Sequence, residues 1–144
     1  MIKYRKILML LLFFFTAFTL FCDDLVLVGT EDRNNDGKPD RWIYSKPDDG
    51  FIIKTDTNFD SKVDHILETD NMGNKMYEEM DFNHDGIMDN FYYYSRGVLV
   101  RQEIDSNFDG SIDVWIHLDE GVYIVRIERD TNHDGEVDFV KAYR

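Results

Sequence analysis

Cysteine is almost absent from this sequence, because Cys22 is the single one in 144 residues. One cysteine cannot form a disulfide within the chain, so no covalent link supports the fold. Basic residues are also few: 16 lysines and arginines stand against 29 aspartates and glutamates, and the formal net charge is −13. This balance argues against nucleic acid as a partner, since a basic surface supplies most of the affinity for phosphates. It suits a protein that collects cations.

Helical periodicity is missing too, except in the first 22 residues. Lys3, Arg5 and Lys6 form a short basic start, and residues 7–21 are an apolar run broken only by two threonines. The run is shorter than the roughly 20 residues of a membrane-spanning helix and has the length of an export-signal core. We therefore predict an exported protein, with an uncleaved anchor as the alternative.

Cys22 stands where the apolar run stops. The order of basic start, apolar run and cysteine resembles a bacterial lipoprotein signal, in which the cysteine is acylated and becomes the first residue of the mature chain. The resemblance implies a signal peptide over residues 1–22, lipidation of Cys22 and attachment to the membrane of the cell envelope. The alternative is a plain signal peptide cleaved nearby, which would leave the protein periplasmic or secreted.

The remainder, residues 23–144, is built on a repeat. Five stretches follow the pattern D-x-N-x-D-G-x-x-D, and their starts lie 24 or 25 residues apart. Self-similarity at a fixed period marks a repeat architecture. The stretches read "DRNNDGKPD", "DTNFDSKVD", "DFNHDGIMD", "DSNFDGSID" and "DTNHDGEVD", beginning at Asp32, Asp56, Asp81, Asp105 and Asp130.

Short aromatic and β-branched runs precede and follow each acidic stretch, as in strands. Tight-turn signals containing Gly50, Gly73, Gly97 and Gly121 separate the runs. Each repeat therefore predicts a β-hairpin. The fold class is all-β: an antiparallel meander of about ten strands, with the acidic loops on one edge and the tight turns on the other. A sheet of this size tends to curl or close, and the sequence leaves an open ribbon and a closed barrel as alternatives.

Two columns of equivalent positions run through the repeats. The returning strands carry a column that we expect to be solvated, formed by Lys54, Glu79, Glu103 and Glu128. A second column, two residues past the last aspartate of each loop, predicts the core; an aromatic shelf for a ligand is the alternative. Its members are Trp42, Ile66, Phe91, Trp115 and Val140.

The acidic loops have the chemistry of a hard-cation site. Ca²⁺ takes roughly six to eight oxygen ligands. Loop positions 1, 3 and 5 offer side-chain oxygens, position 7 a backbone carbonyl and position 9 a carboxylate, while glycine at position 6 allows a sharp turn. An apolar residue at position 8 is expected to fix the end of each loop to the core. The candidate ligands are Asp32, Asn34, Asp36, Lys38, Asp40, Asp56, Asn58, Asp60, Lys62, Asp64, Asp81, Asn83, Asp85, Ile87, Asp89, Asp105, Asn107, Asp109, Ser111, Asp113, Asp130, Asn132, Asp134, Glu136 and Asp138.

The pattern resembles the first half of the EF-hand loop, which recurs in dockerins and thrombospondin type 3 repeats, and is most similar to the loops of integrin α-subunit propeller repeats. The resemblance implies up to five Ca²⁺ sites between strands. The EF-hand glutamate at position 12 is missing, so a helix–loop–helix is not expected. The tandem arrangement of these loops, each followed by an aromatic strand, also resembles the repeats of some exported bacterial proteins. The residues at position 12 are Ile43, Leu67, Tyr92, Ile116 and Lys141.

The alternative is that the loops are turns without metal, because Asp and Asn cap turns through their own backbone. Capping needs one carboxylate, whereas each loop carries three that repel one another. Calcium is therefore favoured over a plain turn, and over magnesium, which prefers tight octahedral sites. Without the position-12 glutamate the sites should be weak, roughly 10⁻⁴–10⁻³ M. The second loop, which begins at Asp56, should bind calcium most weakly, because Ser61 stands where the other loops have glycine.

The sequence predicts a calcium-stabilised binding or structural module at the cell envelope, whose partner is a protein or cell-surface component. An enzyme is the first alternative, but no serine or cysteine nucleophile stands out. A calcium sensor is the second, although no bistable element is visible. The four histidines are His65, His84, His117 and His133, and the side chains of His84 and His133, at loop position 4, are expected to point outward.

Overall fold

The computed structural model describes residues 25–47 and 49–143. The predicted signal peptide and Cys22 lie outside the described residues. Within the described ranges, no helix has the length and apolar character needed to cross a membrane.

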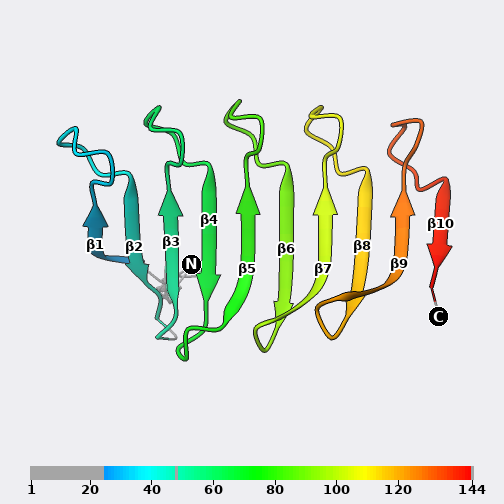
Figure 1. The fold of residues 1–144 in the computed structure, drawn as a ribbon, viewed down its shortest axis with the longest axis horizontal. Coiled ribbons are helices and arrows are strands. Elements are labelled where there is room, and N and C mark those ends of the chain that lie inside the picture. Colours follow the sequence, from blue (N-terminus) through cyan, green and yellow to red (C-terminus); the bar gives the residue numbers. More distant parts are fainter. Residues whose placement is uncertain (1–24, 48, 144) are drawn as a thin grey trace, which may run out of the picture.

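All ten strands belong to one antiparallel sheet, in which the order in space is the order in sequence (Figure 1). This confirms the predicted all-β meander. The runs predicted as strands coincide with the observed strands to within one residue at either end. These runs are residues 25–30, 41–45, 51–55, 65–69, 75–80, 90–94, 98–104, 114–118, 122–129 and 139–143. The strands are β1 Val26–Glu31, β2 Arg41–Ser45, β3 Phe51–Thr55, β4 His65–Thr69, β5 Lys75–Met80, β6 Asn90–Ser95, β7 Val98–Ile104, β8 Val114–Asp119, β9 Tyr123–Arg129 and β10 Phe139–Ala142.

The sheet is open. β1 pairs with β2 and β10 pairs with β9, and these two strands form the ends of the row. The question of ribbon against barrel is therefore settled in favour of the ribbon. The five acidic loops lie along one edge and the tight hairpins along the other (Figure 1). We number the loops 1 to 5: residues 32–40, 56–64, 81–89, 105–113 and 130–138.

The hairpin edge is made by turns with left-handed backbone. Arg96 and Gly97 have φ of 52° and 78°, and Glu120 and Gly121 have φ of 50° and 75°. Two consecutive positive φ values are typical of the type I′ turn, whose twist matches that of paired strands. At Gly121 a Cβ would also lie 3.1 Å from Cγ1 of Val98. Glycine is thus needed there for both conformation and space.

The charged column and the expected core column lie on the same face, and this corrects the prediction. Trp42 is the cross-strand partner of Lys54, Phe91 of Glu103, and Trp115 of Glu128. Directly opposed residues project to the same side of a sheet. Because the chain reverses at every turn, each expected-core position on an outgoing strand lies directly opposite a position of the charged column on a returning strand. We call this side the aromatic face.

The aromatic face is not a core. Trp42, Ile66, Phe91 and Trp115 are half-buried, and Val140 is 54 % exposed. The physical reason is that the sheet forms a single layer, so no second layer covers the face among the described residues. The opposite side, the aliphatic face, carries the row Ile43, Ile53, Leu67, Glu78, Tyr92, Gln102, Ile116, Ile127 and Lys141.

Burial is concentrated at the loop edge and is mostly polar. Val114 is the one buried hydrophobic side chain in the described part of the chain. Most of the buried polar residues there are loop aspartates. The expected anchoring by position 8 is wrong for loops 1 and 5, where Pro39 and Val137 are exposed, again because no core lies beneath them. The buried loop aspartates are Asp40, Asp56, Asp64, Asp81, Asp89, Asp105, Asp113 and Asp130.

Candidate metal centre

Each loop connects the two strands of a hairpin and is closed by one backbone hydrogen bond. The amide of the position-9 aspartate donates to the carbonyl of the residue before position 1, as from Asp89 to Met80 at 2.8 Å. This bond extends the strand ladder by one step and brings positions 1 and 9 together. The same bond closes all five loops, at 2.8–3.0 Å.

Neighbouring loops are joined in the same way. The amide of each position-1 aspartate from loop 2 onward donates to the carbonyl of position 9 in the preceding loop, as from Asp81 to Asp64 at 2.8 Å. Positions 1 and 9 of successive loops therefore bury one another. Asp32 and Asp138 have no further loop on their outer side, and these two are the exposed members of the set.

The carboxylates at positions 1 and 9 accept backbone hydrogen bonds from inside their own loop. The position-6 amide donates to Oδ2 of position 1 in every loop, at 2.6–2.9 Å. The position-2 amide donates to position 9 in every loop, at 2.7–3.0 Å. Each loop is thus wrapped around its own carboxylates, as the spacing of the aspartates predicts.

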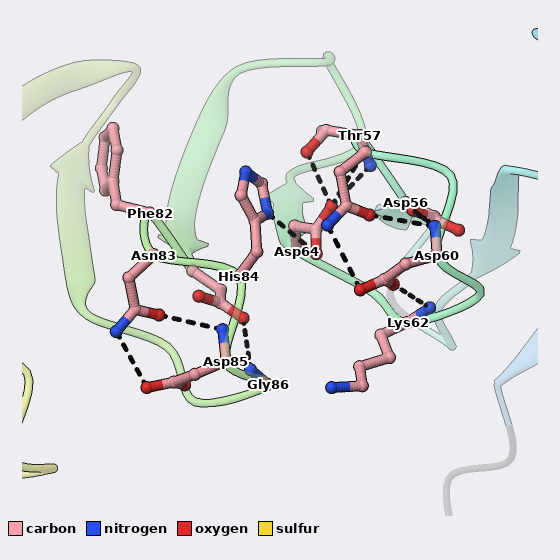
Figure 2. A network of polar contacts seen from close by, with 12 residues as sticks. Asp56, Thr57, Asp60, Lys62, Asp64, Phe82, Asn83, His84, Asp85 and Gly86 are labelled. Atoms are coloured by element: carbon pink, nitrogen blue, oxygen red, sulfur yellow. Dashed lines mark hydrogen bonds and ion pairs between the residues drawn. The ribbon is translucent and has the colours of Figure 1, made fainter.

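Positions 3, 5 and 7 form a smaller, exposed network. Oδ1 of the asparagine at position 3 accepts the position-5 amide at 2.9–3.1 Å. Oδ1 of the aspartate at position 5 accepts the position-7 amide at 2.8–2.9 Å. The side chains at position 7 play no part in these bonds. Lys62, for example, extends towards loop 3, where its Nζ lies 3.5 Å from the site of a Cβ on Gly86 (Figure 2).

Two positions in each loop have left-handed backbone. Position 4 has φ between 59° and 65° in all five loops, although no glycine stands there. Position 6 is glycine except at Ser61, whose φ is 74°. A non-glycine residue in this region costs roughly 1–2 kcal/mol. The loops therefore hold a strained conformation that their hydrogen bonds maintain.

The histidines at position 4 do not simply point outward, which corrects the sequence expectation. Nδ1 of His84 lies 3.4 Å from Oδ1 of Asp64 in the preceding loop (Figure 2). His133 makes the equivalent approach to Asp113 at 3.6 Å. The reason is that neighbouring loops lie side by side along one edge, so a left-handed residue in one loop faces the last aspartate of the loop before it.

The carboxylates converge most closely in loop 2. One oxygen from each of Asp56, Asp60 and Asp64 lies within 4.8 Å of the other two, and this is the one such cluster found among the described residues. In loop 3, Oδ1 of Asp81 is buried and has no hydrogen-bond partner. Buried carboxylate oxygens are costly without a partner. The donor set and this orphaned oxygen both fit a hard cation.

The pKa values of the loop acids vary with their surroundings. Burial raises the pKa of Asp89, and the nearby charges of Asp81 and Asp85 raise it further. Burial also raises the pKa of Asp64, but hydrogen bonds from Thr57 and His84 outweigh it and the net pKa is lowered. The surroundings therefore disfavour the negative charge of Asp89 in loop 3 and favour that of Asp64 in loop 2.

Glu78 is a buried acid that the sequence analysis missed. It is 5 % exposed on the aliphatic face and contacts Lys75 at 2.7 Å, His65 at 2.8 Å and Tyr94 at 2.7 Å. Burial raises its pKa, but these three partners outweigh it and leave the pKa lowered. A signal was present: the equivalent position is Ile53 in one repeat and isoleucine or glutamine in the others.

Comparison with known proteins yields little. No family model matches the chain, and no curated protein matches it in sequence. One similar solved structure is the crystal structure of accessory secretory protein 1, 2 and 3 in Streptococcus pneumoniae, with a TM-score of 0.43 and 16 % identity. The match covers 75 % of this chain and 20 % of that one, so the chain spans about a fifth of that structure's length. This likeness carries no functional argument.

Proposed function

We propose that the five acidic loops bind calcium and that the bound ions stabilise the sheet. The observation that carries this proposal is the burial of eight loop carboxylates without a lysine or arginine ion pair among the described residues. Two of them have a histidine nearby as the only possible charged partner. Buried charges in proteins are normally paired or bound to metal. A divalent cation in each loop would supply the missing positive charge.

The arrangement of oxygens favours calcium over other metals. Each loop offers carboxylates at three positions, an amide oxygen and a backbone carbonyl, and no sulfur ligand. Such oxygen-rich, irregular sites suit Ca²⁺, whereas Mg²⁺ requires near-octahedral geometry and transition metals favour imidazole or thiolate. The expected affinity is weak, roughly 10⁻⁴–10⁻³ M, as in extracellular modules.

A melting experiment tests the stabilising role. Calcium at about ten times its dissociation constant contributes roughly 1.4 kcal/mol per occupied site. We expect the midpoint of thermal unfolding to rise by several degrees or more in millimolar calcium, relative to chelator, and to rise less in magnesium. Equal midpoints in calcium and in chelator would contradict the proposal.

The protein as a whole would act as a binding or structural module at the cell envelope. Its single-layered sheet has two faces that no second layer covers among the described residues. The His65–Glu78 and His117–Glu128 pairs lie on opposite faces, and neither is hydrogen-bonded to a serine among the described residues. These contacts support a scaffold over an enzyme. The partner would be a protein or another cell-surface component.

Attachment to the envelope would come from acylation of Cys22. We expect the protein from a bacterial host to partition into detergent and to carry the added mass of lipid. Cys22→Ala should abolish both properties. If the wild-type protein stays in the aqueous phase with an unmodified mass, it is periplasmic or secreted instead.

A further inference from the structure

The aromatic face carries a regular pattern that calcium binding does not explain. Three strands, β2, β6 and β8, each present two rings that are two residues apart. The intervening strands present charged residues at the same level: Lys54 in β3, Glu103 in β7 and Glu128 in β9. At the level of Trp42, Phe91 and Trp115, large apolar side chains and charged side chains therefore alternate in stripes from strand to strand. The ring pairs are Trp42 with Tyr44, Phe91 with Tyr93, and Trp115 with His117.

The stripes recur at a fixed distance. Strands in a sheet lie about 4.8 Å apart, so positions on alternate strands repeat every ~9.6 Å. Phe91 and Trp115 occupy successive stripes, Ile66 fills the ring position in β4, and Trp42 stands one stripe further along. A linear ligand lying across the strands would meet equivalent groups once in every two strands.

The rings of the first row remain available. Among the described residues, the ring and cation contacts on this face involve the tyrosines: Tyr77 with Tyr93 at 5.3 Å, Arg101 over Tyr93 at 4.0 Å and Lys54 over Tyr44 at 5.6 Å. No such contact covers Trp42 or Trp115 there. Both are half-buried. Trp42 lies opposite Thr30 and Lys54, and Trp115 lies opposite Glu103 and Glu128.

The aromatic face has little net charge, unlike the loop edge. It holds five acids and four bases, and Glu103 pairs with Arg101 at 3.4 Å while Glu128 pairs with Arg126. A surface with so little net charge attracts a charged partner only weakly. Its carboxylates and guanidinium groups still offer many hydrogen bonds. The acids are Glu68, Glu79, Glu103, Asp119 and Glu128, and the bases are Lys46, Lys54, Arg101 and Arg126.

From this pattern we infer that the aromatic face binds an uncharged, β-linked glycan chain that lies across the strands. The C–H faces of alternate sugars would stack on Phe91, Trp115 and Trp42, and sugar hydroxyls would bond to the charged stripes between them. The disaccharide repeat of an extended β-linked chain is similar in length to two strand spacings. The inference rests on the proposed role as a binding module and names its partner class, but it does not require calcium.

Titration calorimetry with cellohexaose and chitohexaose, run on the purified protein in calcium and in chelator, tests the inference. We expect at least one oligosaccharide to bind and the double variant F91A/W115A to bind about tenfold more weakly or worse. The matched control is Y92A/I116A, which alters the adjacent residues on the aliphatic face and should bind as the wild type does. Far-UV spectra confirm that each variant is folded.

Two results would overturn the inference. One is the absence of binding to either oligosaccharide by a protein that is folded, including the case in which the aromatic face instead joins two copies in sedimentation experiments. The other is equal loss of binding in the two double variants. Failure of calcium to bind would leave the glycan result unaffected, so the two proposals fail separately.

Discussion

The protein buries two kinds of acid. Glu78 lies in the middle of the sheet, where Lys75, His65 and Tyr94 surround it. The eight buried aspartates lie at the loop edge, where their partners are mainly backbone amides. The contrast shows that a hydrogen bond and a counter-charge are separate requirements of a buried carboxylate. Glu78 finds both within the chain, whereas the loops supply hydrogen bonds and, under the function proposed above, a calcium ion would supply the counter-charge.

Removing the charge of Glu78 gives the largest expected effect. Glu78→Gln should destabilise the protein by about 1–3 kcal/mol at neutral pH, because Lys75 loses its partner. The loss should be the same in calcium and in chelator, as measured by denaturant unfolding. A loss of stability that appears only in calcium would mean that Glu78 acts through the calcium loops and is not an independent contribution.

The pH dependence of this effect has a definite sign. The pKa of folded Glu78 is lowered from its ordinary value of 4.5. The ionised group therefore stabilises the fold above that value, and the stabilisation disappears as the pH falls through the lowered pKa. The difference between Glu78→Gln and the wild type should shrink on acidification below about pH 4.5.

Unlike Glu78→Gln, Asp89→Asn should change stability by an amount that depends on calcium. The amide keeps an acceptor for the N–H of Phe82 but removes the negative charge. The pKa of Asp89 is raised, so its charge disfavours folding when no cation is present. In chelator the variant should be as stable as the wild type or more so, and in calcium it should lose roughly 1–2 kcal/mol.

This change of sign separates a metal loop from a capped turn. The matched control is Asp119→Asn at the hairpin edge, which should alter stability equally little in both conditions. If the stability of Asp89→Asn relative to the wild type is the same in calcium and in chelator, the loop acids cap the turns and do not bind calcium.

Ser61→Gly should give the smallest effect. Serine at φ 74° is strained, and glycine adopts this conformation freely. We expect a gain of about 0.5–1 kcal/mol in unfolding free energy. Gly135→Ala, at φ 89° with open space around it, should lose a similar amount. Opposite shifts in these two variants would confirm that position 6 sets the strain of the loop.

The fold could be predicted because the same pattern of strand, loop, strand and turn recurs in five repeats. Alternation marked the strands, glycine marked the turns, and the antiparallel order followed from short connections. What failed was the assignment of a core. Trp42 and Trp115 resemble core residues in composition, but only the cross-strand register reveals that Lys54 and Glu128 lie beside them on one face.

The wrapping of each loop around its own aspartates could be predicted from the sequence, whereas the contacts between neighbouring loops could not. The spacing of Asp81, Asn83, Asp85 and Asp89 determined which groups meet within the loop. The approach of His84 to the preceding loop depended on how loops pack against one another, which a single repeat does not encode. Whether the sheet stays open or closes could not be predicted from the sequence either, because closure depends on the twist accumulated over all the strands.

The most direct test of the account is a calorimetric titration of the protein with calcium, which measures stoichiometry and affinity together. We expect heat of binding at millimolar calcium or below, with up to five ions per chain and dissociation constants of roughly 10⁻⁴–10⁻³ M. A protein that takes up no calcium at these concentrations would contradict it, and the loop aspartates would then be caps of the turns alone.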